Sequence, residues 1–272
     1  MARSSRTVAA CCWKSTITIR PELGRSMTDG GPLHRAARDE EHSMKTITFA
    51  IDGRDGRTER AIAIHTLVIA GWTGRDTVAM EQHIRELEAL GVKRPATTPV
   101  FYRVAADRLD PSPAIQVSGG QSSGEAEFVL VRDGGDTFVG IASDHTDREV
   151  ETYGITVSKQ MCGKPCANTL WRLDDVTGHW DRLVLRAYAT IDGERVLYQE
   201  GKVTAMRAPD DLLAQFARHG GRFDDGTAML CGTLAAIGGI RPAERFEVEL
   251  EDPVLDRTIR HAYAVDTLPV AG

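Results

Sequence analysis

Residues 125–142 read Glu-Ala-Glu-Phe-Val-Leu-Val-Arg-Asp-Gly-Gly-Asp-Thr-Phe-Val-Gly-Ile-Ala, and this stretch indicates the fold most directly. Its apolar runs, 125–131 and 137–142, have the length and the β-branched and aromatic content of buried strands. Asp133-Gly-Gly-Asp136 stands between them and is typical of a hairpin turn, because glycine tolerates the positive φ angles that such turns need. The stretch therefore predicts a β-hairpin.

The sequence on both sides of this hairpin is also rich in short apolar runs. We predict further strands at residues 46–51, 61–70, 100–104, 113–117, 182–191, 195–199, 226–233, 245–251 and 258–265. Two stretches have helical character: 76–90, with Asp76 as N-cap and Gly91 as stop, and 209–218. Many short strands with only two or three helices predict a mixed, β-rich α+β fold around one core.

The composition is that of a globular protein with an acidic surface. The chain has 272 residues, 42% of them hydrophobic and 26% charged, which is enough for a large core. Its net charge is −6, and residues 44–272 hold 26 Lys and Arg against 34 Asp and Glu. Nucleic acid is not expected as a partner, because phosphate binding needs a basic surface. An acidic chain fits a small-molecule enzyme that gathers carboxylates around a cation, although an acidic surface also serves solubility.

The first 43 residues differ from the rest of the chain. They mix Arg, Ser, Gly and Asp without a period, so we expect a disordered leader at 1–43 and a single domain at 44–272. No stretch approaches the roughly 20 apolar residues that a membrane-spanning helix needs. The five cysteines do not form the pattern of a secreted disulfide framework. We therefore expect a cytoplasmic protein with reduced thiols and without a membrane partner.

Glu125 and Glu127 are the first candidate ligands for a metal ion. Residues two apart in a strand point to the same side, so both carboxylates would face one way and repel unless a cation lies between them. Carboxylate oxygens suit Mg²⁺, Mn²⁺ or Ca²⁺ better than zinc. The alternative is that both are solvated residues at a strand edge, which is the common case for an isolated Glu-x-Glu.

A polar segment, Ser143-Asp-His-Thr-Asp-Arg-Glu149, follows the strand expected at 137–142. Asp144 and Asp147 are candidate ligands in this segment, and His145 is a weaker one. Functional groups collect in loops that follow strands. A hydrophilic turn is the alternative, and it would be preferred if the segment stood alone.

Three further residues could take part in catalysis. His83 and Glu86 lie three apart on the expected helix 76–90, so the carboxylate could orient the imidazole as a general base for water. Lys159 follows an apolar stretch, and a partly desolvated lysine could bind a carboxylate or stabilise an enolate. A solvated His-Glu pair and a lysine that reaches the surface along its apolar stem are the ordinary alternatives.

In their order along the chain, these pieces resemble motifs of the fumarylacetoacetate hydrolase superfamily. Glu125 and Glu127 fall on the family's Glu-x-Glu, and Ser143–Glu149 is similar to Asn-Asp-Val-Ser-Ala-Arg-Asp. The closing segment is the most specific, because Gly232-Thr-Leu-Ala-Ala-Ile-Gly238 and the following Glu-Val-Glu strand resemble Gly-Thr-Pro-Ala-Gly-Val-Gly and its alternating strand. The segment 198–206 resembles Gln-x-Gly-x-Thr-x-x-Met. The resemblance covers about residues 62–265.

The resemblance implies a role for each matching residue. It implies Glu125, Glu127 and Asp144 as ligands of a divalent metal, Mg²⁺ first and Mn²⁺ or Ca²⁺ as alternatives. It implies that His83 and Glu86 activate water from a lid helix. It implies Lys159, matched to the lysine of Gly-Lys-Ser-Phe-Asp, as a third catalytic residue, and Arg148, Gln199 and Thr233 as substrate-binding residues. A β-roll of mixed sheets with a few short helices and a homodimer are implied as well.

The chain departs from the family pattern at several positions. Asp144 follows Glu127 by 17 residues, whereas the family has a longer connection. Leu234 stands in place of the proline of Gly-Thr-Pro, and Ser143 in place of asparagine. The Gly-Lys-Ser-Phe-Asp element is reduced to Ser158-Lys-Gln-Met161. These differences bear on the substrate and on the reaction more than on the metal ligands.

The expected function is metal-dependent hydrolysis of a C–C bond in an acylpyruvate-like or other 2-oxo or 1,3-dicarbonyl acid. The first alternative is a 2-oxo acid decarboxylase, hydratase, dehydratase or isomerase that uses the same metal site. The second is a non-catalytic domain that binds a small ligand. A cysteine enzyme ranks last, although a thiol of Cys162 or Cys166 near Lys159 and Lys164 could have a depressed pKa.

Overall fold

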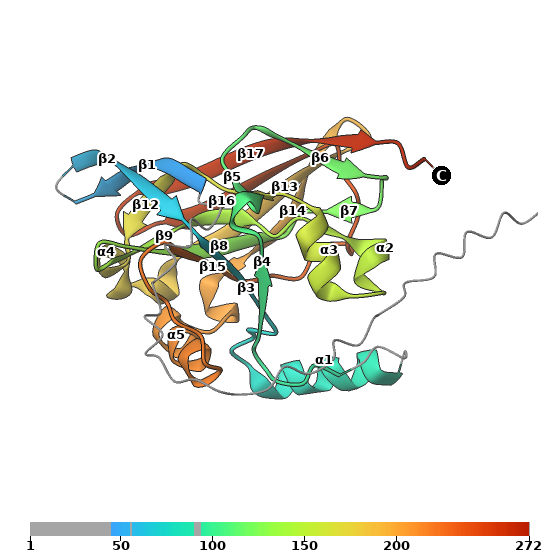
Figure 1. Cartoon of the computed structure of the whole chain (residues 1–272), viewed down its shortest axis with the longest axis horizontal. Helices are drawn as coiled ribbons and strands as arrows, with labels where there is room; N and C mark the ends of the chain where they lie inside the picture. The colour runs from blue at the N-terminus through green and yellow to red at the C-terminus, as the bar shows by residue number, and fades with distance from the viewer. Residues whose placement is uncertain (1–44, 55, 90–93, 272) are drawn as a thin grey trace, which may run out of the picture. The chain divides into compact units, whose positions relative to one another are not determined.

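The computed structural model describes residues 45–54, 56–89 and 94–271 (Figure 1), and the leader expected at 1–43 lies outside them. The described residues fall in one compact unit, Glu41–Gly272. That residues 44–272 act as a single catalytic domain stays a prediction.

An eight-stranded mixed sheet forms the larger part of the fold, with the strand order β2-β1-β12-β9-β8-β15-β3-β4. Its strands are β1 (Lys45–Gly53), β2 (Gly56–Ile64), β3 (Thr66–Gly71), β4 (Val100–Val104), β8 (Ala126–Asp133), β9 (Asp136–Ser143), β12 (Thr169–Arg172) and β15 (Thr227–Thr233). β15 pairs with β3 in parallel and with β8 in antiparallel orientation, so the sheet is mixed.

A five-stranded sheet has the order β14-β13-β16-β17-β6. Its strands are β6 (Ala114–Ser118), β13 (Val184–Ile191), β14 (Glu194–Lys202), β16 (Arg245–Asp252) and β17 (Arg257–Leu268). Two short pairs complete the strands: β5 (Leu109–Asp110) with β11 (Lys164–Pro165), and β7 (Ser122–Ser123) with β10 (Thr146–Asp147). In Figure 1, β17 and β16 lie above β8 and β9. β16 contacts both β8 and β9, and β17 contacts β9.

The helices are short and lie around the sheets (Figure 1). The α-helices are α1 (Thr77–Ala89), α2 (Arg148–Glu151), α3 (Ile155–Met161), α4 (Leu173–Thr177) and α5 (Pro209–Arg218), and the 3₁₀ turns are η1 (Ala106–Arg108), η2 (Trp180–Arg182) and η3 (Val203–Ala205). α1 and α5 confirm the two helices predicted from periodicity. The other three have seven residues or fewer, which is too short for a period of 3.6 to be recognised.

The predicted hairpin is confirmed as β8 and β9. Gly134 and Gly135 form its turn with φ angles of 57° and 82°, which glycine adopts without strain. The strands pair from Asp133 and Asp136 at the turn to Ala126 and Ser143 at the open end. The open end of this hairpin is where the polar segment predicted from sequence begins.

Both faces of the large sheet are buried. On one face, alternate residues of β8, including Phe128, pack against the five-stranded sheet, including Val248 of β16. On the other face, Val129 belongs to a second cluster that includes Ile47 of β1 and Leu67 of β3. Since β1 and β3 lie toward opposite edges of the sheet, this second cluster extends across most of the face. The mixed, β-rich fold predicted from sequence is confirmed.

Gly232 creates an irregularity in β15 that matters for the site. The pairing of β15 with β8 shifts between Leu230 and Thr233, so two residues of β15 bulge opposite β8. Gly232 has a φ angle of 98°, and a Cβ atom there would lie 1.8 Å from Oγ1 of Thr73. Only glycine fits this bulge without displacing Thr73.

We expect Gly232→Ala to lower the free energy of unfolding by about 3 kcal/mol or more, because it adds a clash to an unfavourable φ angle. Gly135→Ala is the matched control: Gly135 also has a positive φ angle, but a Cβ atom there would meet nothing within 4 Å. It should cost only about 1 kcal/mol. Urea denaturation of both variants checks this, and equal losses would contradict the close contact at Gly232.

Candidate functional site

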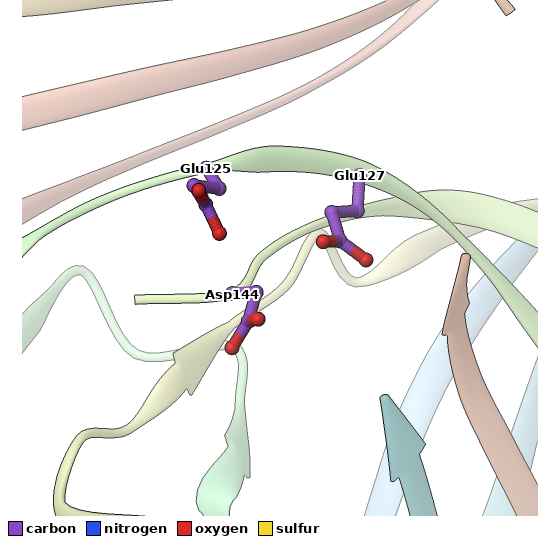
Figure 2. A group of neighbouring side chains, drawn as sticks. All are labelled: Glu125, Glu127 and Asp144. Carbon is purple, nitrogen blue, oxygen red and sulfur yellow. The ribbon is translucent and has the colours of Figure 1, made fainter. Parts of the chain in front are cut away.

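The hairpin register brings three carboxylates together. The amide of Asp144 donates to the carbonyl oxygen of Glu125 over 2.9 Å, which extends the β8–β9 pairing by one residue. Glu125 and Glu127 project from one side of this strand toward the segment that carries Asp144 (Figure 2). One oxygen from each of Glu125, Glu127 and Asp144 lies within 4.8 Å of the others. The structure thus brings together the three residues predicted as metal ligands.

Glu127 is buried and is held by the bulge of β15. Its Oε2 accepts a hydrogen bond of 2.7 Å from the amide of Gly232. Its side chain is only 3% exposed, and no hydrogen bond to Oε1 is found among the described residues. One carboxylate oxygen is therefore fixed by the backbone and the other is left to meet a ligand.

Gln199 and Thr233 hold the backbone between the two glutamates. The side-chain oxygen of Gln199 accepts from the amide of Ala126, and its NH₂ group donates to Oγ1 of Thr233 and to the carbonyl of Leu234. Thr233 in turn donates to the carbonyl of Ala126 over 2.8 Å. Both polar groups of the Gln199 side chain are satisfied by protein. A contact of Gln199 or Thr233 with substrate stays a prediction.

Two buried lysines converge on Asp144. Lys159 of α3 pairs with its Oδ2, and Lys164 of β11 lies 3.2 Å from its Oδ1 and donates to the carbonyl of His145 over 2.5 Å. Burial alone would raise the pKa of Asp144, but the two ammonium groups outweigh it and lower the pKa to about 2. Asp144 is therefore ionised at neutral pH. The same ion pair raises the pKa of Lys159 despite its burial.

Arg148 is the third cation beside the carboxylates. Its guanidinium lies 3.1 Å from Oε1 of Glu125 and 2.9 Å from Oε2 of Glu151, and its Nε donates to Oγ of Ser123. Asp147, which begins α2, uses its carboxylate to accept from the amide of Val150. Arg148 thus lies beside the acidic group, whereas the carboxylate of Asp147 caps a helix and is not among the three that converge.

The two glutamates are poorly compensated. Burial, followed by repulsion from Asp144 and Glu125, raises the pKa of Glu127 well above its usual value. Burial also raises the pKa of Glu125, and Arg148 opposes the shift. Clustered carboxylates whose charged forms lack compensation favour the binding of a cation, and their hard oxygens suit Mg²⁺, Mn²⁺ or Ca²⁺. The residues present therefore fit a divalent metal ion.

A buried polar network lies behind the acidic group. The hydroxyl of Tyr263 is 2.7 Å from Oγ of Ser143 and 3.0 Å from Nδ1 of His145, and Nε2 of His145 is 2.8 Å from Oγ of Ser122. Ser143 also accepts from the amide of Glu125. Burial, with Lys164 and Arg148, lowers the pKa of His145 to about 3, so this imidazole is neutral. The imidazole of His145 thus bonds to Tyr263 and Ser122 rather than to the three carboxylates.

Lys164 and Tyr263 are residues of the site that the sequence analysis did not select. For Lys164 a signal was present, because Gly163-Lys164 matches the first two residues of Gly-Lys-Ser-Phe-Asp, whereas Lys159 lacks the glycine. The structure places both lysines on Asp144. No local signal identified Tyr263, which comes from β17, 119 residues after Asp144.

Two other sequence predictions have different outcomes. His83 and Glu86 lie on α1, as predicted, but their side chains fall outside the described residues, and their part in catalysis stays a prediction. The cysteine enzyme ranks last, and the depressed thiol pKa that it would need is not found at Cys162 or Cys166. Burial raises the pKa of Cys162 and raises that of Cys166 to about 12, because a thiolate is poorly stabilised away from water.

Residues 70–263 match the family described as proteins of unknown function, DUF2848. The chain belongs to the DUF2848 family. Comparison with curated protein sequences finds no match for this DUF2848 protein. Among its described residues, no helix is long and apolar enough to cross a membrane.

Solved structures resemble the DUF2848 chain in fold. Crystal structures of Cg1458 match with a TM-score of 0.55 and 14% identity, over 82% of this chain and 100% of that chain. A protein assigned as a fumarylpyruvate hydrolase from Burkholderia cenocepacia matches with a TM-score of 0.54 and 15% identity, over 83% and 96%. A 2-keto-3-deoxy-D-arabinonate dehydratase complexed with magnesium and 2,5-dioxopentanoate matches with a TM-score of 0.53 and 15% identity, over 78% and 77%.

These neighbours support the predicted resemblance at the level of the fold. The β-roll of mixed sheets with few helices, expected from the fumarylacetoacetate hydrolase superfamily, is confirmed. At these identities the likeness concerns the fold alone. Any function of the DUF2848 chain must be argued from its own site.

Opposite pKa shifts in the metal-free protein predict two pH limits to stability. Glu127 has a raised pKa, so its contribution is full below the unfolded value of 4.5 and is lost as the pH rises through the folded value. Asp144 has a lowered pKa, so its contribution is present above 3.8 and is lost as the pH falls toward about 2. Stability should therefore fall on both sides of the region near pH 4 to 5.

Glu127→Gln tests the upper limit, because the amide keeps an acceptor for Gly232 and removes the charge. We expect the variant to lose less stability than the wild type above pH 4.5, by about 1.4 kcal/mol for each unit of the pKa shift. Urea denaturation between pH 4 and 9 with a chelator present measures this. Parallel pH profiles for the two proteins would show that the pKa of Glu127 is not raised in the folded protein.

Proposed function

We propose that this protein is a divalent-metal-dependent enzyme that hydrolyses a C–C bond in an acylpyruvate-like or other 2-oxo or 1,3-dicarbonyl acid. The observation that carries the proposal is the convergence of Glu125, Glu127 and Asp144, with oxygens within 4.8 Å of one another. A divalent ion bound by these residues would draw electron density from two oxygens of such a substrate. The magnesium in the structure of the dehydratase neighbour supports Mg²⁺ as the first candidate.

The charge balance of the site favours an acidic substrate. Glu125, Glu127, Asp144 and Glu151 are close to three cations: Arg148, Lys159 and Lys164. A divalent ion in addition would make this region net positive. A substrate with one or two carboxylates would restore the balance, and Arg148 could pair with a carboxylate through parallel hydrogen bonds.

Each remaining step can be assigned to a side chain. For hydrolysis, His83 oriented by Glu86 would accept a proton from water as the oxygen of that water attacks the acyl carbon. The C–C bond then breaks, and its electron pair passes to the 2-oxo group of the leaving fragment, where Lys159 or Lys164 would stabilise the negative oxygen. A proton returned to the leaving carbon completes the 2-oxo acid product.

A lyase is the second candidate function. One of the solved neighbours, complexed with magnesium and 2,5-dioxopentanoate, is a dehydratase. Two lysines on one carboxylate would serve any reaction that develops charge on a 2-oxo group. Decarboxylation, dehydration and isomerisation need this stabilisation but no attacking water. A non-catalytic ligand-binding domain, the remaining alternative, would bind the metal ion but show no turnover. A cytoplasmic location and a homodimer remain parts of the proposal.

Metal binding is tested by thermal unfolding with and without Mg²⁺. At a concentration one hundred times the Kd, we expect Mg²⁺ to stabilise the wild type by about 2.7 kcal/mol. Glu127→Gln and Asp144→Asn should lose most of this effect, whereas Glu194→Gln, which changes an exposed carboxylate in the β13–β14 turn, should keep it. A full response to Mg²⁺ in Asp144→Asn would remove Asp144 from the ligands.

The reaction is tested by a turnover screen of acylpyruvates, oxaloacetate and sugar-derived 2-oxo acids with and without Mg²⁺. We expect metal-dependent hydrolysis of an acylpyruvate, reduced about a hundredfold or more by Glu127→Ala. His83→Ala should reduce kcat for hydrolysis by about a hundredfold, the lower end for loss of a general base. Undiminished turnover in His83→Ala with loss in Glu127→Ala would favour the lyase. Metal binding without any turnover would favour the ligand-binding domain.

A further inference from the structure

A groove lies on the outer side of α3, away from the carboxylates. Its volume is about 400 Å³, and its lining residues come from β4, η1 and α3. β4 and α3 are in contact and lie side by side in Figure 1. Its lining residues are Arg103, Arg108, Thr156, Val157, Gln160 and Met161. The function proposed above uses none of these residues.

The groove carries positive charge that is weakly compensated. Arg103 reaches only a hydroxyl, Oγ1 of Thr66, over 3.4 Å, and has no ion pair among the described residues. Arg108 has its nearest described carboxylate in Asp107, 3.6 Å from Nε, and that side chain is 55% exposed. The chain as a whole has a net charge of −6, so these two guanidinium groups form a local region of opposite sign. They make this groove attractive to an anion.

The other polar residues of the lining add donors. Oε1 of Gln160 accepts from the amide of Ala105 over 2.8 Å, and this bond leaves the NH₂ group of Gln160 as a donor. Thr156 contributes a hydroxyl, and no carboxylate is among the six lining residues. A pocket of guanidinium, amide and hydroxyl groups matches carboxylate oxygens, because arginine pairs with them through two parallel N–H donors.

An apolar surface completes the groove. Val157 and Met161 lie one turn apart on α3 and are 47% and 39% exposed. These exposed apolar side chains lie in the same groove as the two arginines. Such a surface suits a ligand that has an apolar part next to its charged group. A bare inorganic anion would leave this surface exposed.

The groove and the carboxylate site use different residues of the same two elements. On α3, Lys159 is buried against Asp144 while Gln160 lines the groove. On β4, the ring of Tyr102 lies 5.9 Å from Nζ of Lys159, while Arg103 lines the groove. The groove is therefore separate from the carboxylates. One of its walls is α3, which the buried Lys159–Asp144 ion pair holds in place.

We propose that this groove binds a small organic carboxylate that carries an apolar substituent. Arg103 and Arg108 pair with the carboxylate from β4 and η1, Gln160 and Thr156 donate from α3, and the substituent covers Val157 and Met161. This binding does not require the metal site, so it is independent of the proposed catalytic function.

Benzoate is a suitable probe, and benzamide is its uncharged counterpart of the same shape. Isothermal titration calorimetry of the metal-free full-length chain should show one benzoate per chain and binding of benzamide at least about tenfold weaker, since a hydrogen bond to a charged group contributes more than one to a neutral group. Inorganic phosphate, which has charge without an apolar part, should also bind more weakly than benzoate.

Arg103→Gln and Arg108→Gln should each weaken benzoate binding about tenfold or more while leaving the thermal midpoint unchanged. Arg222→Gln, which changes an arginine whose side chain is 82% exposed, is the matched control and should bind as the wild type does. Equal affinity in all three variants would place benzoate elsewhere and overturn the proposal. If benzamide bound as tightly as benzoate, the argument from charge would be overturned. If phosphate bound more tightly than benzoate, the argument from the apolar surface would be overturned.

Discussion

The hydrogen bond from the amide of Asp144 to the carbonyl of Glu125 fixes the geometry on which the rest of the site depends. It extends the ladder that begins at the Gly134-Gly135 turn and runs to Ala126 and Ser143. Because side chains alternate along a strand, this register puts Glu125, Glu127 and Asp144 on the same side. A shift of one residue would turn Asp144 toward the opposite face and separate it from both glutamates.

Placing three carboxylates together in a protein interior is unfavourable, and the surroundings show how the fold tolerates it. Lys159 and Lys164 compensate Asp144, Arg148 compensates Glu125, and the Gly232 amide donates to Glu127. Their compensation is uneven, because the pKa of Asp144 is lowered whereas those of both glutamates are raised. The remaining imbalance is local to the glutamates, which is where a bound cation would lower the free energy most.

Much of this arrangement could be predicted from the sequence because it depends on local order. The apolar runs 125–131 and 137–142 and the glycine turn between them are sufficient to predict the hairpin. The 17-residue spacing from Glu127 to Asp144, a departure from the family pattern, is explained by the register of this hairpin. Contacts between distant segments could not be predicted in this way. Tyr263, Gln199 and the bulge at Gly232 reach the hairpin from other strands, and their pairing is set by tertiary packing.

Burial also explains why the last-ranked alternative, a cysteine enzyme, finds no support. That alternative depended on two lysines close to a thiol in the sequence, since nearby positive charge stabilises a thiolate. In the structure, the ammonium groups of Lys159 and Lys164 are directed at Asp144, and Cys162 is only 1% exposed. The cost of removing a thiolate from water then exceeds the attraction of a lysine that is already paired, so the pKa rises. The same lysines that would activate a cysteine in an open cleft serve here to hold an aspartate ionised, and for that reason the chemistry of the site belongs to its carboxylates.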